Sequence, residues 1–210
     1  MISKLNNYKL IFWDFDGVIK DSLEVKREAF ANIFQGIDDQ TKLRIKKHHD
    51  ENGGMSRYEK IPLYLEFANK SKKDEDVQSY LNLFSRHVKS GVINSKWCDG
   101  VKEYLSQNYN DQYFILLTAT PTVEIKEIVY ELKIDMFFKE IYGSPIKKNE
   151  IVNNILKKLK FKNSEVALLG DSKNDYIAAK KNNINFYLKM NQYNEKLQNE
   201  IECFKYSKIS

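Results

Sequence analysis

Short apolar runs that alternate with helical periodicity set the pattern of this chain. Three runs, at Leu10–Trp13, Tyr113–Leu117 and Val166–Leu169, are almost wholly apolar, as in strands that are buried on both faces of a parallel sheet. Helical periodicity follows two of them, from Val123 to Leu132 and from Asp175 to Lys181. This alternation predicts a doubly wound, Rossmann-like α/β domain, in which ligands bind at the carboxyl ends of the strands.

A helical insertion interrupts this alternation. Between residues 22 and 96 the strand pattern is missing, and apolar residues recur at helical spacing. We therefore expect a sheet domain made of residues 1–21 and 97–210, with an inserted α-helical domain made of residues 22–96. Two weaker strands of the sheet are expected at Phe137–Tyr142 and Asn185–Leu188.

The composition narrows the class of protein. A chain of 210 residues that is 42% hydrophobic can bury a core without disulfides or metals. Its 34 basic residues face 29 acidic ones and are scattered, which is untypical of a nucleic-acid surface but leaves anionic small molecules as partners. Cys98 and Cys203 have no metal-ligand spacing, and no apolar run reaches the ~18 residues of a membrane span. We expect a cytoplasmic protein without membrane or nucleic-acid partners, either a monomer or a homodimer.

Two carboxylates stand at the end of the first apolar run. Asp14 and Asp16 are two residues apart, so in extended geometry both side chains project on the same side, and Gly17 lets the chain turn behind them. Such a pair suits catalysis, although an Asp-Gly turn that closes a strand has the same pattern.

A second acidic cluster follows the run at Val166–Leu169. Asp171 and Asp175 would join Asp14 and Asp16 at one edge of the sheet, where four acids repel one another unless a cation intervenes. A hard divalent ion with oxygen ligands, most simply Mg²⁺, resolves this repulsion. Acids at a helix N-terminus are the alternative, but that explanation does not cover both clusters.

Two further segments offer groups that suit a phosphoryl oxygen. Thr118 ends an apolar run and provides a hydroxyl, with the backbone N–H of Ala119 beside it, although a strand-end cap is an equal interpretation. Lys148 offers a positive charge, and its neighbour Lys147 is the other candidate for the inward-facing lysine.

In this order, the motifs resemble those of the haloacid dehalogenase-like hydrolase superfamily: Asp-x-Asp-Gly-Val, a strand-end Thr, a Lys and Gly-Asp-x-x-x-Asp. The resemblance implies that Asp14 is the nucleophile and that Asp16 is the general acid and base. To act as an acid, Asp16 requires a raised pKa. It further implies that Thr118 and Lys148 bind the phosphoryl group. Asp171 and Asp175 would hold Mg²⁺ together with the Asp14 carboxylate and the Asp16 carbonyl.

The insertion is similar to the helical cap of the β-phosphoglucomutase and phosphoglycolate phosphatase group. Gly54-Met55-Ser56-Arg57 is similar to the cap segment that holds the distal phosphate in β-phosphoglucomutase, which makes Arg57 the candidate substrate-binding cation. The alternative is a helix-start Arg paired with Glu59 or Glu66. His48 and His49 precede this segment, and we expect them to face solvent.

The resemblance favours a phosphatase over a mutase. Where β-phosphoglucomutase has a His, a dozen positions after the first Asp, this chain has Lys26. The expected function is therefore Mg²⁺-dependent hydrolysis of a small phosphorylated metabolite, such as a sugar phosphate, through an aspartyl-phosphate on Asp14. A phosphomutase of the β-phosphoglucomutase type and a non-catalytic phosphate-binding protein are the alternatives.

Overall fold

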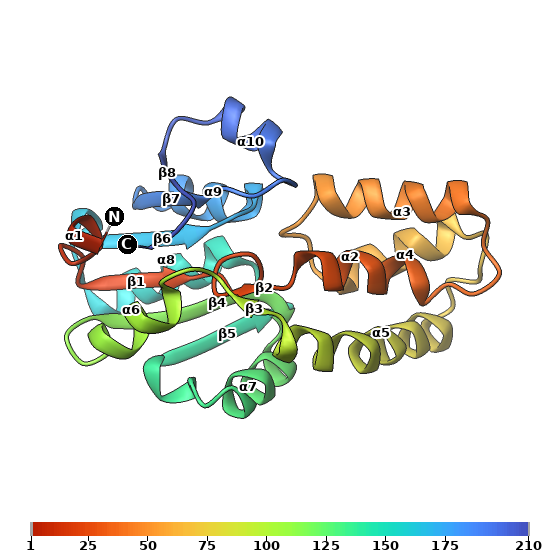
Figure 1. The fold of residues 1–210 in the computed structure, drawn as a ribbon, viewed down its shortest axis with the longest axis horizontal. Coiled ribbons are helices and arrows are strands. Elements are labelled where there is room, and N and C mark those ends of the chain that lie inside the picture. The colour runs from red at the N-terminus through yellow and green to blue at the C-terminus, as the bar shows by residue number, and fades with distance from the viewer. Residues whose placement is uncertain (1, 210) are drawn as a thin grey trace.

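The computed structural model describes residues 2–209 and contains a six-stranded parallel sheet in the order β5-β4-β1-β6-β7-β8 (Figure 1). Its strands are β1 (Leu10–Trp13), β4 (Tyr113–Pro121), β5 (Glu140–Ser144), β6 (Val166–Gly170), β7 (Asn185–Lys189) and β8 (Phe204–Tyr206). The first strand in the chain thus lies between β4 and β6. Loops that leave these neighbouring strands meet at one edge of the sheet, as in other doubly wound folds.

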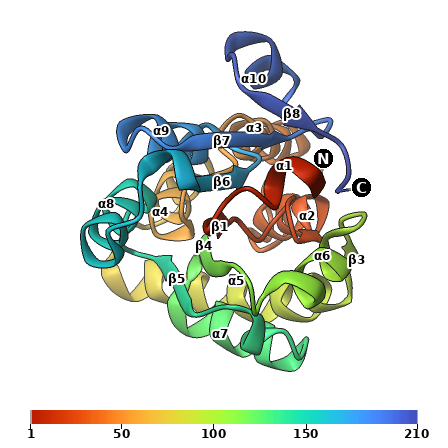
Figure 2. The ribbon, with the colours of Figure 1, turned by 90° about the vertical axis from the view of Figure 1, so that its left-hand side faces the viewer.

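Helices cover both faces of the sheet (Figure 2). One face packs against α1 (Ile2–Leu5), α6 (Val101–Asn108) and α7 (Thr122–Glu131), and the other against α8 (Lys148–Leu159), α9 (Lys173–Lys181) and α10 (Glu195–Glu200). Successive side chains of a strand point to opposite faces. Accordingly, Ile11 and Trp13 enter one core, and Leu10 and Phe12 enter the other.

The predicted fold class is confirmed, with shifts at individual elements. The strand expected at Phe137–Tyr142 begins later, at Glu140, because Asp135–Phe137 forms a short 3₁₀ turn. Neither α10 nor β8 was expected, because each is short and has a weak periodic pattern.

Four helices form the insertion: α2 (Leu23–Asn32), α3 (Asp39–Glu51), α4 (Arg57–Phe67) and α5 (Asp74–Asn94). Aromatic side chains fill their common core, in which the rings of Phe30 and Phe84 stack with centroids 3.9 Å apart. Two short antiparallel strands, β2 (Lys20–Asp21) and β3 (Lys96–Trp97), tie the entry of the insertion to its exit. We call these four helices the cap.

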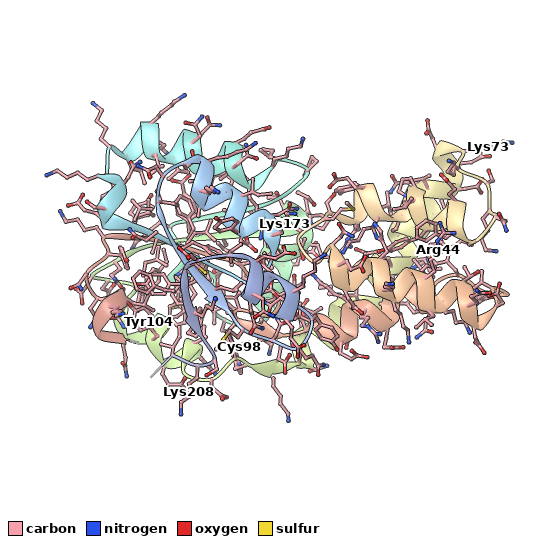
Figure 3. The ribbon with its side chains drawn as sticks, turned by 90° about the horizontal axis from the view of Figure 1, so that it is seen from above. Arg44, Lys73, Cys98, Tyr104, Lys173 and Lys208 are labelled. Atoms are coloured by element: carbon pink, nitrogen blue, oxygen red, sulfur yellow. The ribbon has the colours of Figure 1, made fainter. Side chains whose placement is uncertain are left out.

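The cap lies beyond the carboxyl ends of the strands (Figure 1). In Figure 3, Lys173 at the start of α9 lies near the junction, while Arg44 and Lys73 lie on the cap side. The loop at Gly54 contacts the start of α9, where Asn174 donates a hydrogen bond to the Gly54 carbonyl at 2.8 Å. The edge of the sheet that carries the predicted acids therefore faces the cap.

Candidate active site

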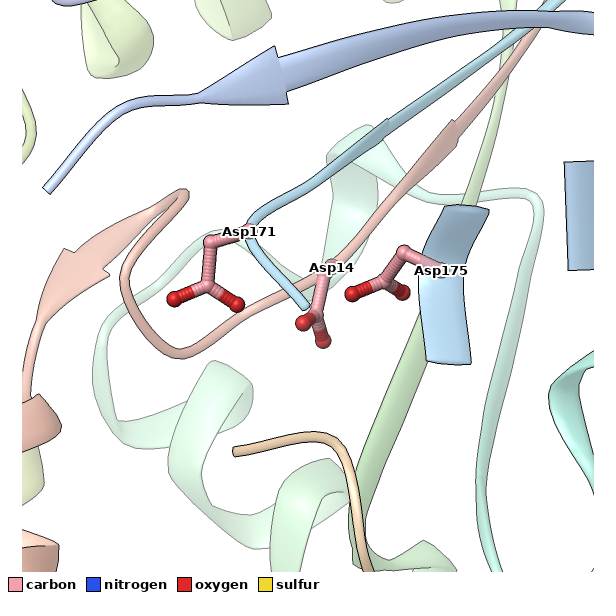
Figure 4. A group of neighbouring side chains, drawn as sticks. All are labelled: Asp14, Asp171 and Asp175. Carbon is pink, nitrogen blue, oxygen red and sulfur yellow. The ribbon is translucent and has the colours of Figure 1, made fainter. Parts of the chain in front are cut away.

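Three buried carboxylates meet at this edge of the sheet (Figure 4). Asp14 follows β1, Asp171 follows β6, and Asp175 lies in the first turn of α9. One oxygen from each carboxylate lies within 4.8 Å of the others. Asp175 is fixed by a capping box, in which the Ser172 backbone N–H donates to its carboxylate at 3.1 Å. The convergence of the three acids is thus built into the strand ends and a helix start.

Lys148 places its ammonium between two of these acids. Its Nζ lies 2.9 Å from Oδ1 of Asp14 and 2.6 Å from Oδ1 of Asp175. Lys147 is exposed, so of the two candidate lysines Lys148 is the one that faces the acids. Burial lowers the pKa of Lys148, but attraction by Asp14 and Asp175 outweighs it and raises the pKa above its ordinary value.

The remaining negative charge makes the cluster a fit for a divalent cation. Burial, together with repulsion by Asp175, raises the pKa of Asp14 to about 7, despite the attraction of Lys148. Burial and repulsion by Asp14 and Asp175 raise the pKa of Asp171 well above its ordinary value. Carboxylates in this state take up protons unless a cation replaces them. Their hard oxygen donors match the ligands that Mg²⁺ prefers.

Asp16 differs from this cluster because a lysine of the cap neutralises it. Lys26 forms a short ion pair with Asp16, and Ser22 donates a hydrogen bond to the same carboxylate at 2.6 Å. Burial alone would raise the pKa of Asp16, but Lys26 and Ser22 outweigh it and lower the pKa. The prediction of a raised pKa for Asp16 is therefore wrong. Lys26, which stands where the mutase has a His, supplies a cation beside this carboxylate.

The predicted phosphate-binding segment lines the same cavity as the acids. Thr118 is buried in β4, and its Oγ1 accepts a hydrogen bond from the backbone N–H of Thr120 at 3.2 Å. Thr118 and Ala119 both line the cavity above Asp14. Sequence reasoning missed Thr120, whose hydroxyl hydrogen-bonds to Lys26 at 2.7 Å and lies 3.3 Å from Asp16.

Arg57 lines this cavity, but its guanidinium pairs with a carboxylate of α7. It donates to both carboxylate oxygens of Glu124 in α7, at 2.7 and 2.5 Å, and to Ser85 at 2.9 Å. The alternative pairing with Glu59 or Glu66 is wrong, because Glu59 caps its own helix and Glu66 pairs with Lys72. Arg57 therefore bridges the cap and α7.

His49 does not face solvent, contrary to the prediction. It is buried, and its Nδ1 lies 3.1 Å from Nζ of Lys60. Lys60 was not singled out, yet it is buried on α4 and lines the cavity with Asp14. A signal existed, since Arg57 and Lys60 occupy positions i and i+3 of the stripe that continues with Ile61 and Tyr64.

Two asparagines after β7 hold Asp171 in place. Asn191 donates to the Asp171 carboxylate at 3.0 Å, and Asn194 donates to its backbone carbonyl at 2.8 Å. The sequence motifs did not predict them, although both asparagines follow a strand whose carboxyl end lies at the same edge of the sheet. Asp171 is thus oriented from the neighbouring strand as well as from its own.

The chain combines a parallel α/β sheet, a helical cap and a cluster of acids at the strand ends. This combination is typical of a capped hydrolase. The sequence model of the haloacid dehalogenase-like hydrolase family matches residues 11–189, and the chain belongs to that family. The comparison with curated proteins found no match. Among residues 2–209, none of the helices combines the length and hydropathy needed to cross a membrane.

Solved structures of similar fold span nearly the whole chain. One is a mutant of CbbY from Rhodobacter sphaeroides in complex with xylulose-1,5-bisphosphate (TM-score 0.76, 15% identity, 96% of this chain and 94% of that one). Another is the candidate HAD hydrolase YfnB from Bacillus subtilis, bound to magnesium (TM-score 0.71, 16% identity, 96% and 95%). A third is a predicted phosphatase from Clostridium acetobutylicum (TM-score 0.69, 22% identity, 95% and 94%). At these identities the likeness establishes the fold.

Proposed function

We propose that this hydrolase is a Mg²⁺-dependent phosphatase that cleaves a small phosphorylated metabolite through an aspartyl-phosphate on Asp14. The observation that carries the proposal is the position of Asp14, at a strand end, 2.9 Å from Lys148 and clustered with Asp171 and Asp175. The proposed organisation is a core domain of residues 1–21 and 97–210 with a cap domain of residues 22–96. The magnesium-bound YfnB structure supports the choice of metal.

Each group has a defined task in the proposed reaction. The Asp14 carboxylate attacks the phosphorus, and Lys148 and Thr118 offset the charge of the phosphoryl oxygens. Asp14, Asp171 and Asp175, with the Asp16 carbonyl, would hold Mg²⁺, which when bound supplies charge screening for the approach of two anions. Asp16 protonates the leaving oxygen and then deprotonates the water that cleaves the aspartyl-phosphate. A phosphate dianion beside Asp16 raises its pKa, which opposes the effect of Lys26.

The cap leaves only a small space over the nucleophile. The cavity above Asp14 has a volume of about 40 Å³, which is room for roughly three water molecules. A phosphate ester with a carbon tail has more heavy atoms than that, so the cap must move to admit it.

The test is phosphate release from a panel of sugar phosphates and short phosphate monoesters, with Mg²⁺ and with EDTA. Mg²⁺-dependent release of inorganic phosphate is expected. Conversion of a sugar 1-phosphate into its 6-phosphate without release would instead establish the mutase. The absence of both reactions across the panel would exclude turnover.

Closure of the cap is expected to depend on Gly54. A Cβ at this position would lie 2.8 Å from the Cβ of Asn174 and 2.4 Å from Oγ of Ser172, which is held by Asp175. Gly54→Ala should therefore lower kcat/KM by roughly 10-fold, since overpacking costs about 1–3 kcal/mol. Gly53→Ala is the matched control, because its nearest neighbour would be 4.0 Å away. Equal activity of the two variants would contradict close packing at Gly54.

Lys26 is expected to set the pH range of turnover. Lys26→Met removes the cation that lowers the pKa of Asp16, so this pKa should rise and Asp16 should stay protonated to higher pH. The alkaline limb of the kcat profile should move to higher pH. Lys46→Met, which removes a cap lysine paired with Glu28, should leave the limb in place. A limb that stays fixed or moves to lower pH in Lys26→Met would argue against proton donation by Asp16.

A further inference from the structure

Lys60 is a buried cation without a carboxylate partner among residues 2–209. The side chain is 1% exposed, and its Nζ contacts Nδ1 of His49 at 3.1 Å and lies 5.4 Å from the centre of the Phe30 ring. An ammonium group has three N–H donors, and burying it without an anion costs free energy. Within the part of the chain that the structure describes, Lys60 makes one side-chain hydrogen bond, which leaves donors for a ligand.

The other cations of this cavity are already neutralised. Lys26 pairs with Asp16, and Arg57 pairs with Glu124 at 2.5 Å. Within the described part of the chain, Lys60 is therefore the cation on the cavity wall whose charge is still available to an incoming anion.

The electrostatics around Lys60 favour binding of an anion. Burial, with repulsion by Lys26, lowers the pKa of Lys60 to about 7. Burial and the neighbouring Lys60 also lower the pKa of His49 well below its ordinary value, so His49 is neutral and accepts a hydrogen bond. An adjoining anion favours the charged amine and so restores the cation that burial disfavours.

Lys60 lies on the cap side of the cavity. Whereas Asp14 and Lys148 belong to the sheet domain, Lys60 and His49 belong to the cap above them. His49 also lines a second cavity of about 360 Å³, which shares Gly53 and Asp171 with the first. The second cavity provides room next to His49 for a part of the substrate that extends away from Asp14.

We propose that Lys60 determines substrate specificity by binding a second oxyanion, a carboxylate or a phosphate, on the leaving group of the phosphate ester. The inference rests on the proposed phosphatase activity. It assigns to Lys60 the role that the sequence suggested for Arg57.

Matched substrates separate the second oxyanion from the rest of the ester. Glycerate 3-phosphate and glycerol 3-phosphate differ only in a carboxylate that replaces a hydroxymethyl group. Fructose 1,6-bisphosphate and fructose 1-phosphate differ only in the second phosphate. The wild-type enzyme should have the higher kcat/KM on the doubly anionic member of at least one pair, and that pair identifies the oxyanion.

Lys60→Met should lower kcat/KM on the preferred, doubly anionic ester by about 10- to 100-fold, the range for a charged hydrogen bond. Activity on its singly anionic match should stay within about 3-fold, because that ester has no second oxyanion for Lys60 to bind. Lys47→Met is the control, because it removes an exposed lysine of the same cap. The Lys60 variant should fold, since it replaces an uncompensated buried charge by an apolar chain of similar length.

Equal losses on both members of a pair would overturn the role of Lys60, and so would a wild-type enzyme without preference for the second oxyanion. If the variant fails to fold, a wild-type enzyme without that preference still overturns the proposal. In either case phosphate release by the wild type would leave the phosphatase standing. Failure of the wild type on every ester would instead remove the proposed function itself.

Discussion

Replacing Asp14 by Asn is expected to reduce phosphate release by at least about 10⁴-fold, because it removes the nucleophile without changing the volume of the side chain. The loss should appear in kcat for every ester, since all of them pass through the same aspartyl-phosphate. Phosphate release at saturating substrate and Mg²⁺ measures it. Activity near that of the wild type would contradict the aspartyl-phosphate mechanism.

The fold should survive this substitution. Asp14 is one of three buried carboxylates that repel one another, and Lys148 keeps Asp175 as a partner at 2.6 Å. The variant should therefore melt no lower than the wild type at neutral pH in the absence of metal. Asp39→Asn provides the control, because it makes the same chemical change at a fully exposed carboxylate of the cap. A large drop in the melting temperature of the Asp14 variant would assign Asp14 a structural role instead.

The core of this site could be predicted from sequence because its acids follow strongly apolar strands. Asp14 and Asp171 each come directly after such a strand, and parallel strands bring their carboxyl ends to the same edge. Lys148 could be narrowed to a pair of lysines, but only the start of α8 determines which of them faces inward. The sequence pattern therefore located the acids but did not determine which of the two lysines provides the cation.

The cap side of the site could not be predicted in the same way. The partner of Arg57 is Glu124, which lies 67 residues away in α7, so neither helical spacing nor a neighbouring acid points to it. Lys26 and Lys60 occupy positions that apolar residues would otherwise fill on α2 and α4, and His49 does so on α3. A basic residue on the apolar face of a helix indicates that its side chain points into the protein. The residue that it pairs with depends on how the helices pack.

Adding Mg²⁺ is expected to raise the melting temperature, and more so at pH 8 than at pH 5. Because the pKa of Asp14 is raised to about 7 and that of Asp171 is also raised, these two carboxyl groups bind more protons in the folded than in the unfolded state from about pH 4 up to their folded pKa values. Without metal, these two acids therefore lose stability as the pH rises through their folded pKa values. At a Mg²⁺ concentration about 100 times its Kd, binding adds about 2.7 kcal/mol, or roughly 5–10 °C for a chain of this size.

Asp171→Asn isolates this effect from the other groups that titrate. The pKa values of His49 and Lys60 are lowered, so their contributions to stability change with pH in the opposite direction, and both residues are present in the variant. Relative to the wild type in EDTA, Asp171→Asn should therefore gain stability as the pH rises from 5 to 8, because it lacks one raised carboxylate. The same variant should lose most of the Mg²⁺-dependent rise, because it also lacks a ligand. Thermal melts at both pH values measure the two effects together, and an undiminished Mg²⁺ response in Asp171→Asn would place the metal elsewhere.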